Sequence, residues 1–501
     1  MTNKDITTVT GLVELLKGEG ELLVTSKEVD PICEVIGVAK AFEDGPAVLF
    51  ENVKGYPNHR ILVNVFGKRS RLAKIFDVPD PKEFKFKCLE AIKNPIPPKV
   101  VDKAPCQEVV ITKDIDVLKT MPVTQSIETD PGRIIGAGIS LVIGAEIDHC
   151  ISFRRTLFRG KDWASMNFNP GSHVGNFLLK LRERNEKLPL TLNIGCPPAI
   201  MTLAATGFLH VATPAATDEL AIAGGLQGAP VEICKAKTVD AYAIANAEWV
   251  IEGYLDPSQP VWESDEAERT GDQWQPFLIE WRGYQGFARR VPRFQATAIT
   301  HRKENPIFYT TVASGLECFT ASGSFAEAAF YDIGNRLRSG LVRDVNVLDG
   351  MHGYAGVVIQ VNKRSRTDDE FIKTLILATF GTSSILQMMV VVDEDVNIYS
   401  AEDVIWALMT RVAPKEDIIS FGLSESGMAV TSERTEGPTL ARVGRLGRLG
   451  FDATVPFDSK DVYARKRHPK VDLEKWFTKE DIDKVWAQQN EYARFIAENR
   501  F

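Results

Sequence analysis

The chain has 501 residues, of which 44% are hydrophobic and 25% charged, with a net charge of −8. This length exceeds what one hydrophobic core organises, so we expect two or three domains. The mild acidity argues against a nucleic-acid binder, and seven dispersed cysteines without a C-x-x-C pair argue against a disulfide scaffold or zinc ribbon. With neither a signal-peptide pattern nor an apolar run near the roughly 20 residues of a membrane span, we expect a cytoplasmic protein without membrane partners.

The first 110 residues read as a small α/β region. Leucines at helical spacing predict a helix over residues 9–18. Two apolar stretches, residues 47–53 and 60–66, flank turn-forming residues and predict a pair of strands. Three prolines between residues 93 and 99 indicate a linker, and we place the first domain boundary near residue 110.

Residues 111–315 are rich in predicted strands. Apolar runs predict strands at residues 134–144, 150–158 and 190–194. Between them, four apolar side chains at i, i+3, i+4 and i+7 predict an amphipathic helix over residues 172–184. We therefore expect a central domain built mainly of strands.

Residues 316–470 alternate strands with helices. Strands are predicted at residues 355–361 and 388–393 and a helix at 401–410, an alternation typical of an α/β domain. The last segment, residues 471–501, is predicted to form one charged helix. Its apolar stripe is narrow, so we expect it to dock on a surface such as that of a neighbouring subunit.

Two side chains of the central region could hold a divalent cation. His173 follows Ser172, a good N-cap, and the helix dipole would keep the imidazole neutral, as metal binding requires. Glu219 follows Asp218 and precedes a run of small residues; a carboxylate and a neutral imidazole together suit a cation that also carries water or phosphate. Because neither residue belongs to a local metal motif, an ordinary capped helix and a solvated acidic pair form the alternative interpretation.

Two adjacent arginines, Arg154 and Arg155, interrupt an apolar strand. Buried without partners they would be costly, so they either face solvent or bind an anion such as a phosphate or a carboxylate. Strand alternation places Cys150, Ser152 and Arg154 on one face, and Phe153 and Arg155 on the other. For Cys150 and Arg155 to line one pocket, the strand must bulge or end between them.

Glu280 stands among the aromatic residues Phe277, Trp281 and Tyr284. Desolvation there would favour the protonated form that a general acid needs. A surface glutamate paired with Arg282 is the alternative.

A basic, glycine-rich segment surrounds Arg448, with Arg442 and Arg445 before it and Asp452 after it. Such a loop can cradle a phosphate. Glycine–arginine runs also form mobile surface turns, which is the alternative here.

Several segments carry a family pattern. The most specific is the acidic strand–turn–helix segment VDEDVNIYSAEDVIWALMTR at residues 392–411, and DELAIAGGLQG, WVIEGYL and GFDAT also fit. On these motifs the chain resembles the UbiD family of prenylated-FMN-dependent decarboxylases over nearly its whole length. KGYP at residues 54–57 and PCQE at 105–108 are similar to the branch acting on hydroxybenzoates and related aromatic acids.

The resemblance implies an α+β multidomain fold. Its parts are an N-terminal α/β region (1–110), a central split β-barrel like those of flavin reductases (111–315), a C-terminal α/β oligomerisation domain (316–470) and a terminal helix (471–501). The implied activity is reversible, non-oxidative decarboxylation of an aromatic or heteroaromatic acid on prenylated FMN supplied by a flavin prenyltransferase. A homo-oligomer, dimer or hexamer, is expected.

The resemblance also assigns roles to residues. The family motif Asn-x-Ser/Gly-x-x-Arg falls on residues 150–155, which implies that Arg155 contacts the flavin and the substrate carboxylate. His173 and Glu219 correspond to ligands of a divalent metal, usually manganese, accompanied by potassium. Glu280 corresponds to the glutamate that protonates the product carbon. The remaining predicted cofactor contacts are Ser152, Phe153, Ser172 and Arg448.

Two positions depart from the family pattern. Cys150 replaces the metal-binding asparagine, and a soft thiolate is a poor ligand for manganese or magnesium. Either the metal differs, or water takes this corner, or the cofactor is held in another way. The second glutamate of the family falls on Gln275, so the Glu-Arg-Glu network of the family is incomplete unless Asp272 or Glu268 substitutes for it.

Three alternative functions stay open. The substrate could be an aromatic acid carried as a CoA thioester. The protein could instead be a reductase-like protein that binds plain FMN. Because the metal corner is altered at Cys150, it could also be a non-catalytic subunit of a carboxylase.

Overall fold

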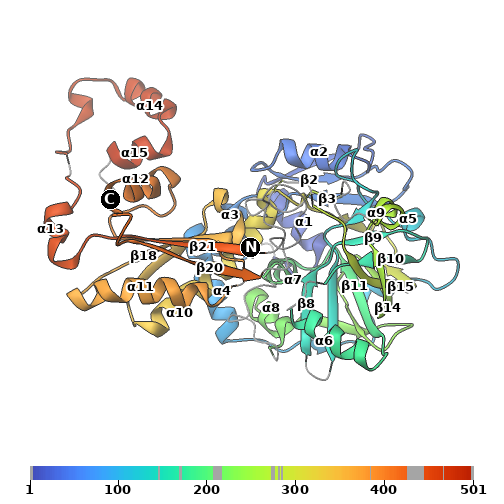
Figure 1. Ribbon diagram of the computed structural model, residues 1–501. Coiled ribbons are helices and arrows are strands. Elements are labelled where there is room, and N and C mark those ends of the chain that lie inside the picture. Colours follow the sequence, from blue (N-terminus) through green and yellow to red (C-terminus); the bar gives the residue numbers. More distant parts are fainter. Residues whose placement is uncertain are drawn as a thin grey trace. The chain divides into compact units, whose positions relative to one another are not determined.

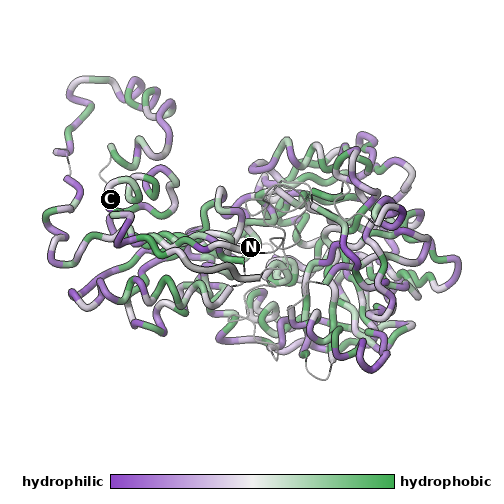
Figure 2. The backbone as a smooth tube through the Cα atoms, in the orientation of Figure 1, coloured by the Kyte–Doolittle hydropathy of each residue, from purple (hydrophilic) through white to green (hydrophobic). Residues whose placement is uncertain are grey.

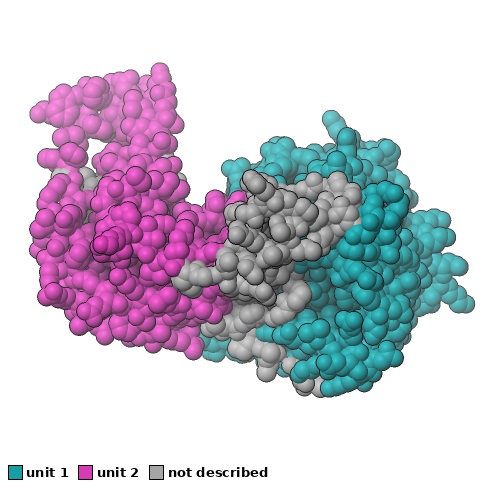
Figure 3. Space-filling view, in the orientation of Figure 1, with its two compact units in different colours: residues 1–328, 425–445 teal, residues 329–424, 446–501 magenta. Residues whose placement is uncertain are grey.

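The computed structural model describes residues 4–144, 147–168, 172–206, 217–271, 277–279, 283, 286–383, 385–425, 445–466 and 468–497. The chain divides into two compact units (Figure 3). Unit 1 comprises residues 1–328 with 425–445, and unit 2 comprises residues 329–424 with 446–501. Among the described residues, no helix is both long and apolar enough to cross a bilayer.

The N-terminal part of unit 1 is a four-stranded sheet with helices around it. The predicted first helix is confirmed as α1 (Val9–Gly18), which begins where the Thr8 hydroxyl accepts the N–H of Gly11 at 3.0 Å. The two predicted strands are confirmed, though each ends three residues earlier than expected. Strand order is β1 (Leu22–Thr25), β2 (Ala47–Phe50), β3 (Arg60–Val63) and β16 (Ile307–Tyr309), and the helices are α2 (Glu34–Ala41), α3 (Arg69–Ile75) and α4 (Phe84–Lys93). Because β16 pairs with β3, residues beyond 300 complete a sheet that the first 63 begin.

The largest sheet of unit 1 has nine strands, all paired antiparallel (Figure 1). Its order is β6-β9-β10-β15-β14-β11-β7-β8, with β5 added beside β15. Two predicted strands are each divided in two, residues 134–144 into β6 and β7 and residues 150–158 into β8 and β9. The strands are β5 (Val109–Ile111), β6 (Ile134–Ile135), β7 (Ile139–Gly144), β8 (Ile147–Phe153), β9 (Thr156–Phe158), β10 (Trp163–Met166), β11 (Leu188–Ile194), β14 (Trp249–Trp262) and β15 (Arg290–His301).

Helices and a small three-stranded sheet accompany this large sheet. The sheet has the order β13 (Tyr242–Ile244), β12 (Glu232–Lys235), β4 (Lys99–Val100). The predicted amphipathic helix is confirmed as α6, and the apolar side chains of Val174, Leu178 and Leu181 are buried on it. The helices are α5 (Val117–Thr120), α6 (His173–Glu183), α7 (Pro198–Ala204), α8 (Glu219–Gln227) and α9 (Asp265–Thr270).

Helix α8 packs unusually closely against the segment that follows α4. A Cβ atom at Gly224 would overlap the carbonyl oxygen of Ile96, and one at Gly225 would lie 2.7 Å from the carbonyl oxygen of Asn94. The Ile96 N–H donates to the Ala221 carbonyl at 2.8 Å. Glycine is required at both positions because backbone meets backbone here, and the contact fixes α8 relative to the N-terminal region.

Unit 2 is an α/β structure, as predicted. In its five-stranded sheet, β18, β19 and β21 run parallel. Strands β18 and β19 are mainly hydrophobic along their length (Figure 2), as buried parallel strands usually are. Helix α10 (Leu316–Leu337) begins in unit 1 and ends in unit 2. The strand order is β17 (Val342–Asn346), β18 (Gly356–Val361), β19 (Met388–Asp393), β21 (Arg445–Ala453), β20 (Ile418–Glu425), and the helices are α11 (Arg366–Phe380) and α12 (Ala401–Arg411).

The prediction of a single C-terminal helix is wrong. After the short α13 (Lys460–Tyr463), the chain forms α14 (Lys479–Gln488) and α15 (Glu491–Ala497). Gln489 between them is extended, with φ −78° and ψ 141°, and the Asn490 side chain accepts the Ala493 N–H at 2.8 Å. A residue that favours helix N-caps therefore starts a new helix where continuous helical spacing had been expected.

Candidate active site

Strand β8 ends between Cys150 and Arg155. Cys150 pairs with Val142 of β7 and Ser152 with Ser140, but the strand stops at Phe153 and β9 starts only at Thr156. Cys150 and Arg155 would lie on opposite faces of a continuous strand, so they can line one pocket only if the strand bulges or ends between them. The structure therefore meets the geometric condition for a shared site.

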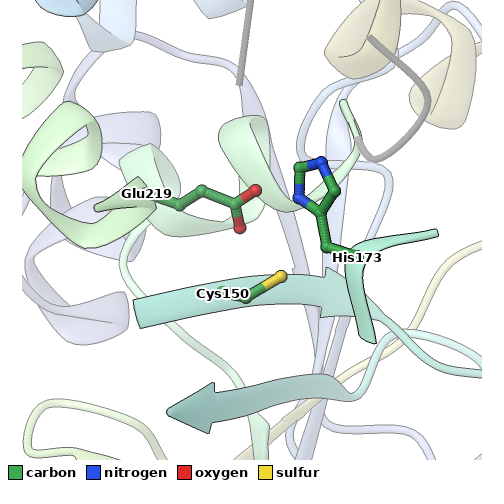
Figure 4. A group of neighbouring side chains, drawn as sticks. All are labelled: Cys150, His173 and Glu219. Carbon is green, nitrogen blue, oxygen red and sulfur yellow. The ribbon is translucent and has the colours of Figure 1, made fainter. Parts of the chain in front are cut away.

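Three side chains from different elements converge beside β8 (Figure 4). The sulfur of Cys150, a ring nitrogen of His173 and a carboxylate oxygen of Glu219 all lie within 4.8 Å of one another. His173 and Glu219 are the first residues of α6 and α8, placed there by the N-caps Ser172 and Asp218. Two helix N-termini with their positive dipole ends thus meet at this cluster.

Burial dominates the electrostatics of the cluster. It raises the pKa of Glu219 to about 7, against the opposing effect of the Ile151 N–H, which donates to Oε2 at 2.6 Å. Burial and the neighbouring Glu219 carboxylate raise the pKa of the Cys150 thiol. The expected alternative of a solvated acidic pair is thereby wrong for Glu219, which is buried.

Arg154 is buried on the same face as Cys150, as strand alternation predicted. Burial lowers the pKa of its guanidinium to about 10, and the group interacts electrostatically with Cys150 and Glu219. Its Nε donates to the Ser140 hydroxyl at 3.1 Å, and Nη2 donates to the Ser152 hydroxyl. Its carbon Cζ lies 4.0 Å from the centre of the Phe168 ring. Arg154 is therefore a desolvated cation at the cluster.

A second group flanks the first. Nδ1 of His149 lies 3.0 Å from an oxygen of Asp148 and 3.1 Å from one of Asp218. Burial lowers the pKa of His149, but the two carboxylates outweigh it and the net effect is a raised pKa. Asp218 also accepts the Ala221 N–H at 2.9 Å, so it caps α8 and pairs with His149 at once.

Arg155 is held by a carboxylate that the sequence did not identify. Its Nε and Nη2 each donate to an oxygen of Glu263 at 2.9 Å, and the Glu263 side chain is only 2% exposed. Glu263 also accepts the backbone N–H of Arg289 at 3.0 Å, and the Phe277 ring lies 4.9 Å from Cζ of Arg155. The guanidinium of Arg155 is therefore held by two hydrogen bonds to Glu263 and by its contact with the Phe277 ring.

Among the described residues, the carboxylate that pairs with Arg155 is that of Glu263 and not that of Glu268. Glu268 accepts instead from Nη1 of Arg159 at 3.3 Å and is exposed on α9. Asp272, Gln275 and the predicted proton donor Glu280 lie outside the described residues. No local sequence pattern pointed to Glu263, which directly precedes Ser264, the N-cap of α9 that accepts the Ala267 N–H at 3.1 Å.

The other residues predicted to contact the cofactor belong to both compact units. Ser152 is in β8, Phe153 packs partly buried against the core, and Ser172 caps α6. Arg448 belongs to unit 2, in β21, where it is buried and donates to the carbonyls of Phe380 and Ser383, the latter at 3.0 Å. Its role in binding a cofactor stays a prediction.

Comparison with protein families accounts for most of the chain. Residues 13–86 match the N-terminal domain of 3-octaprenyl-4-hydroxybenzoate carboxy-lyase. Residues 99–316 match the Rift-related domain of the same enzyme, and residues 321–453 match its C-terminal domain.

Similar proteins cover nearly the full length as well. The gallate decarboxylase of Lactiplantibacillus plantarum is 31% identical over 475 residues, which are 90% of this chain and 95% of the relative. The 3,4-dihydroxybenzoic acid decarboxylase of Klebsiella pneumoniae superimposes with a TM-score of 0.82 at 29% identity, and the match covers 94% of this chain and 100% of that enzyme's chain. The UbiD-class enzyme HmfF of Pelotomaculum thermopropionicum, in complex with prFMN, superimposes with a TM-score of 0.80 at 27% identity. This match covers 95% of this chain and 100% of the HmfF chain. The chain therefore belongs to the UbiD family of carboxy-lyases, and the relatives it matches include enzymes of the aromatic-acid branch.

Proposed function

We propose that the protein decarboxylates an aromatic or heteroaromatic carboxylic acid, reversibly and without net oxidation, on prenylated FMN. The observation that carries the proposal is Arg155, which Glu263 fixes just beyond the end of β8, the strand that also supplies Cys150 to the buried cluster. A guanidinium held in one plane suits a planar carboxylate. The gallate and dihydroxybenzoate enzymes among the relatives support an aromatic substrate.

The residues around the cluster fit an anionic cofactor. The N-termini of α6 and α8 and the buried guanidinium of Arg154 all favour negative charge at one point, as a flavin phosphate requires. His173 and Glu219 would hold a divalent metal beside that phosphate, with potassium nearby, and Ser152, Phe153, Ser172 and Arg448 would make further cofactor contacts. Manganese, the metal implied by the family, is a poor match for a donor set that includes the Cys150 thiol.

The protein's own residues would orient the acid and deliver a proton. When bound, prenylated FMN supplies the electron sink for loss of carbon dioxide. Arg155 would bind the substrate carboxylate, and its pairing with Glu263 would keep the guanidinium in the productive plane before substrate arrives. Glu280, protonated, would deliver the proton that replaces carbon dioxide on the product carbon.

The proposal includes the architecture and partners of the protein. The nine-stranded sheet would form the split β-barrel that binds the flavin, and the α/β unit would mediate assembly into a dimer or hexamer. A flavin prenyltransferase would supply the cofactor. The relative HmfF, of which an evolved dimeric form is in complex with prFMN, supports a prenylated flavin cofactor and assembly into an oligomer.

Carbon dioxide release from a panel of aromatic acids tests the proposal. The protein would be co-produced with a flavin prenyltransferase, and free acids would be compared with their CoA thioesters. Release from a free acid is the expected result. Absence of turnover on any acid, despite bound prenylated flavin, would leave the reductase-like protein or the carboxylase subunit as the better assignment.

Replacement of Glu263 with glutamine should impair turnover while sparing cofactor binding. The amide keeps the size of the side chain but presents an N–H₂ group to a guanidinium that can only donate, so the two-point pairing with Arg155 is lost. Loss of a hydrogen bond to a charged group predicts a decrease in kcat/KM of about 30-fold. The decrease should include a higher KM, because Arg155 would bind the carboxylate from a less ordered position.

Glu268→Gln is the matched control for Glu263→Gln. Both substitutions neutralise a glutamate near α9, but Glu268 is exposed and pairs with Arg159. Its variant should retain wild-type kinetics. Equal kinetics for both variants, with equal flavin content, would remove Glu263 from the positioning of Arg155.

A further inference from the structure

We propose that the cluster of Cys150, His173 and Glu219 binds a thiol-accepting divalent cation, Zn²⁺ in preference to Mn²⁺, through one sulfur, one nitrogen and one oxygen. The inference deepens the proposed function, because the metal would occupy the cofactor-phosphate corner of the same site. It differs from what the family resemblance implies, since the family metal is usually manganese. Its test measures metal binding directly and does not require decarboxylation.

The geometry already brings the three donor atoms together. In a tetrahedral zinc site, bonds of roughly 2.0–2.3 Å place ligand atoms about 3.5 Å apart. The donors here lie within 4.8 Å of one another, so small side-chain movements would close the site. Figure 4 shows the three side chains, from a strand and two helix starts, pointing toward one another.

Each donor is placed by its own local interaction. Cys150 is fixed in the β7–β8 ladder opposite Val142. The Ile151 N–H, one residue along the same strand, holds an oxygen of Glu219 at 2.6 Å. His173 begins a capped helix, in which the Ser172 hydroxyl accepts the Gly175 N–H at 3.1 Å. These constraints arise from backbone structure, so the cluster is assembled before any ion binds.

The chemistry of the donors selects the class of metal. Oxygen-rich sites suit Mn²⁺ and Mg²⁺, whereas a thiolate combined with imidazole favours Zn²⁺, Co²⁺ or Fe²⁺. Three protein ligands also leave a fourth position, as in catalytic zinc sites, where water or a phosphate oxygen can bind. Sulfur in place of an amide oxygen is therefore expected to change the metal while preserving the open position.

The surroundings compensate for the additional charge. A thiolate in place of a neutral amide makes the site one unit more negative. Arg154, buried on the same strand face, interacts electrostatically with both Cys150 and Glu219. Its guanidinium is fixed by the hydroxyls of Ser140 and Ser152, so the compensating cation is part of the folded strand pair.

Metal-free full-length protein would be titrated with Zn²⁺, Mn²⁺ and Co²⁺ alone. The Co²⁺ complex should show an intense near-ultraviolet sulfur-to-cobalt charge-transfer band. Cys150→Ser should abolish the band. It should also lower the affinity for Zn²⁺ by more than the roughly 10- to 100-fold that losing an outer-shell partner costs. The same variant should change Mn²⁺ affinity by less than about threefold, because Mn²⁺ gains little from the thiolate. Cys150→Asn should shift the preference toward Mn²⁺.

Cys33→Ser is the control, since Cys33 lies outside the cluster. It should keep the cobalt band and the zinc affinity. Absence of the cobalt band in the wild-type protein would overturn the inference, and this measurement needs no variant. Equal losses of Zn²⁺ and Mn²⁺ affinity in Cys150→Ser would also overturn it. A zinc-specific loss together with absent decarboxylation would leave the metal site standing and refute only the proposed function.

Discussion

Replacing Glu280 with glutamine should leave the flavin bound and reduce turnover by about 10³-fold or more. The expected size follows from the 10²- to 10⁴-fold typically lost with a general acid. Glutamine matches the shape of glutamate but has no proton to give to the product carbon. Carbon dioxide release and product formation would be measured on protein with its flavin content determined from the visible spectrum.

Glu304→Gln is the control for Glu280→Gln, because Glu304 is exposed on the turn before β16. Its turnover should equal that of the wild type. Full activity of the Glu280 variant would exclude this residue as proton donor and direct attention to another acid at the site.

Replacement of Glu219 with alanine should remove metal and flavin together. Glu219 supplies the only carboxylate of the cluster with Cys150 and His173 that the described residues form, so its loss should weaken metal binding by more than about 100-fold. The purified variant should contain little metal and little flavin, as measured by elemental analysis and absorbance. An unchanged flavin spectrum would contradict a metal bridge between the protein and the cofactor phosphate.

Loss of stability must be separated from loss of the metal ligand. Alanine removes the acceptor of the buried Ile151 N–H, so it can also lower the stability of the fold. The unfolding midpoint of metal-free Glu219→Ala would therefore be measured against that of the metal-free wild type. Glu232→Ala, at a glutamate that is 39% exposed and pairs with Lys99 at 3.7 Å, should retain both metal and flavin.

Local rules predicted much of the site. Ser172 identified the start of α6 and therefore the place of His173, since a serine before an amphipathic pattern is a strong N-cap signal. Strand alternation put Cys150 and Arg154 on one face. It also predicted that the strand must bulge or end before Arg155 if Arg155 and Cys150 are to share a pocket, and β8 does end there. These features depend on neighbours in sequence, which periodicity can detect.

Features that depend on distant partners were missed. Glu263 pairs with Arg155 across 108 residues, and nothing in either local pattern links them. Glu268 was considered because it is close to Gln275 in sequence, but it faces Arg159 on the exposed side of α9. The C-terminal break at Gln489 was missed because helical spacing continues through it, while the Asn490 cap restarts the helix.

The close packing of α8 couples the N-terminal region to the corner proposed to hold the cofactor. Glu219 opens a helix whose glycines touch the backbone of residues 94–96, so that corner is positioned by a segment outside the central domain. Chimaeras that join the N-terminal region of one relative to the central domain of another should lose flavin unless residues 91–96 and α8 come from the same parent. Modular exchange between relatives would then have to cut the chain elsewhere.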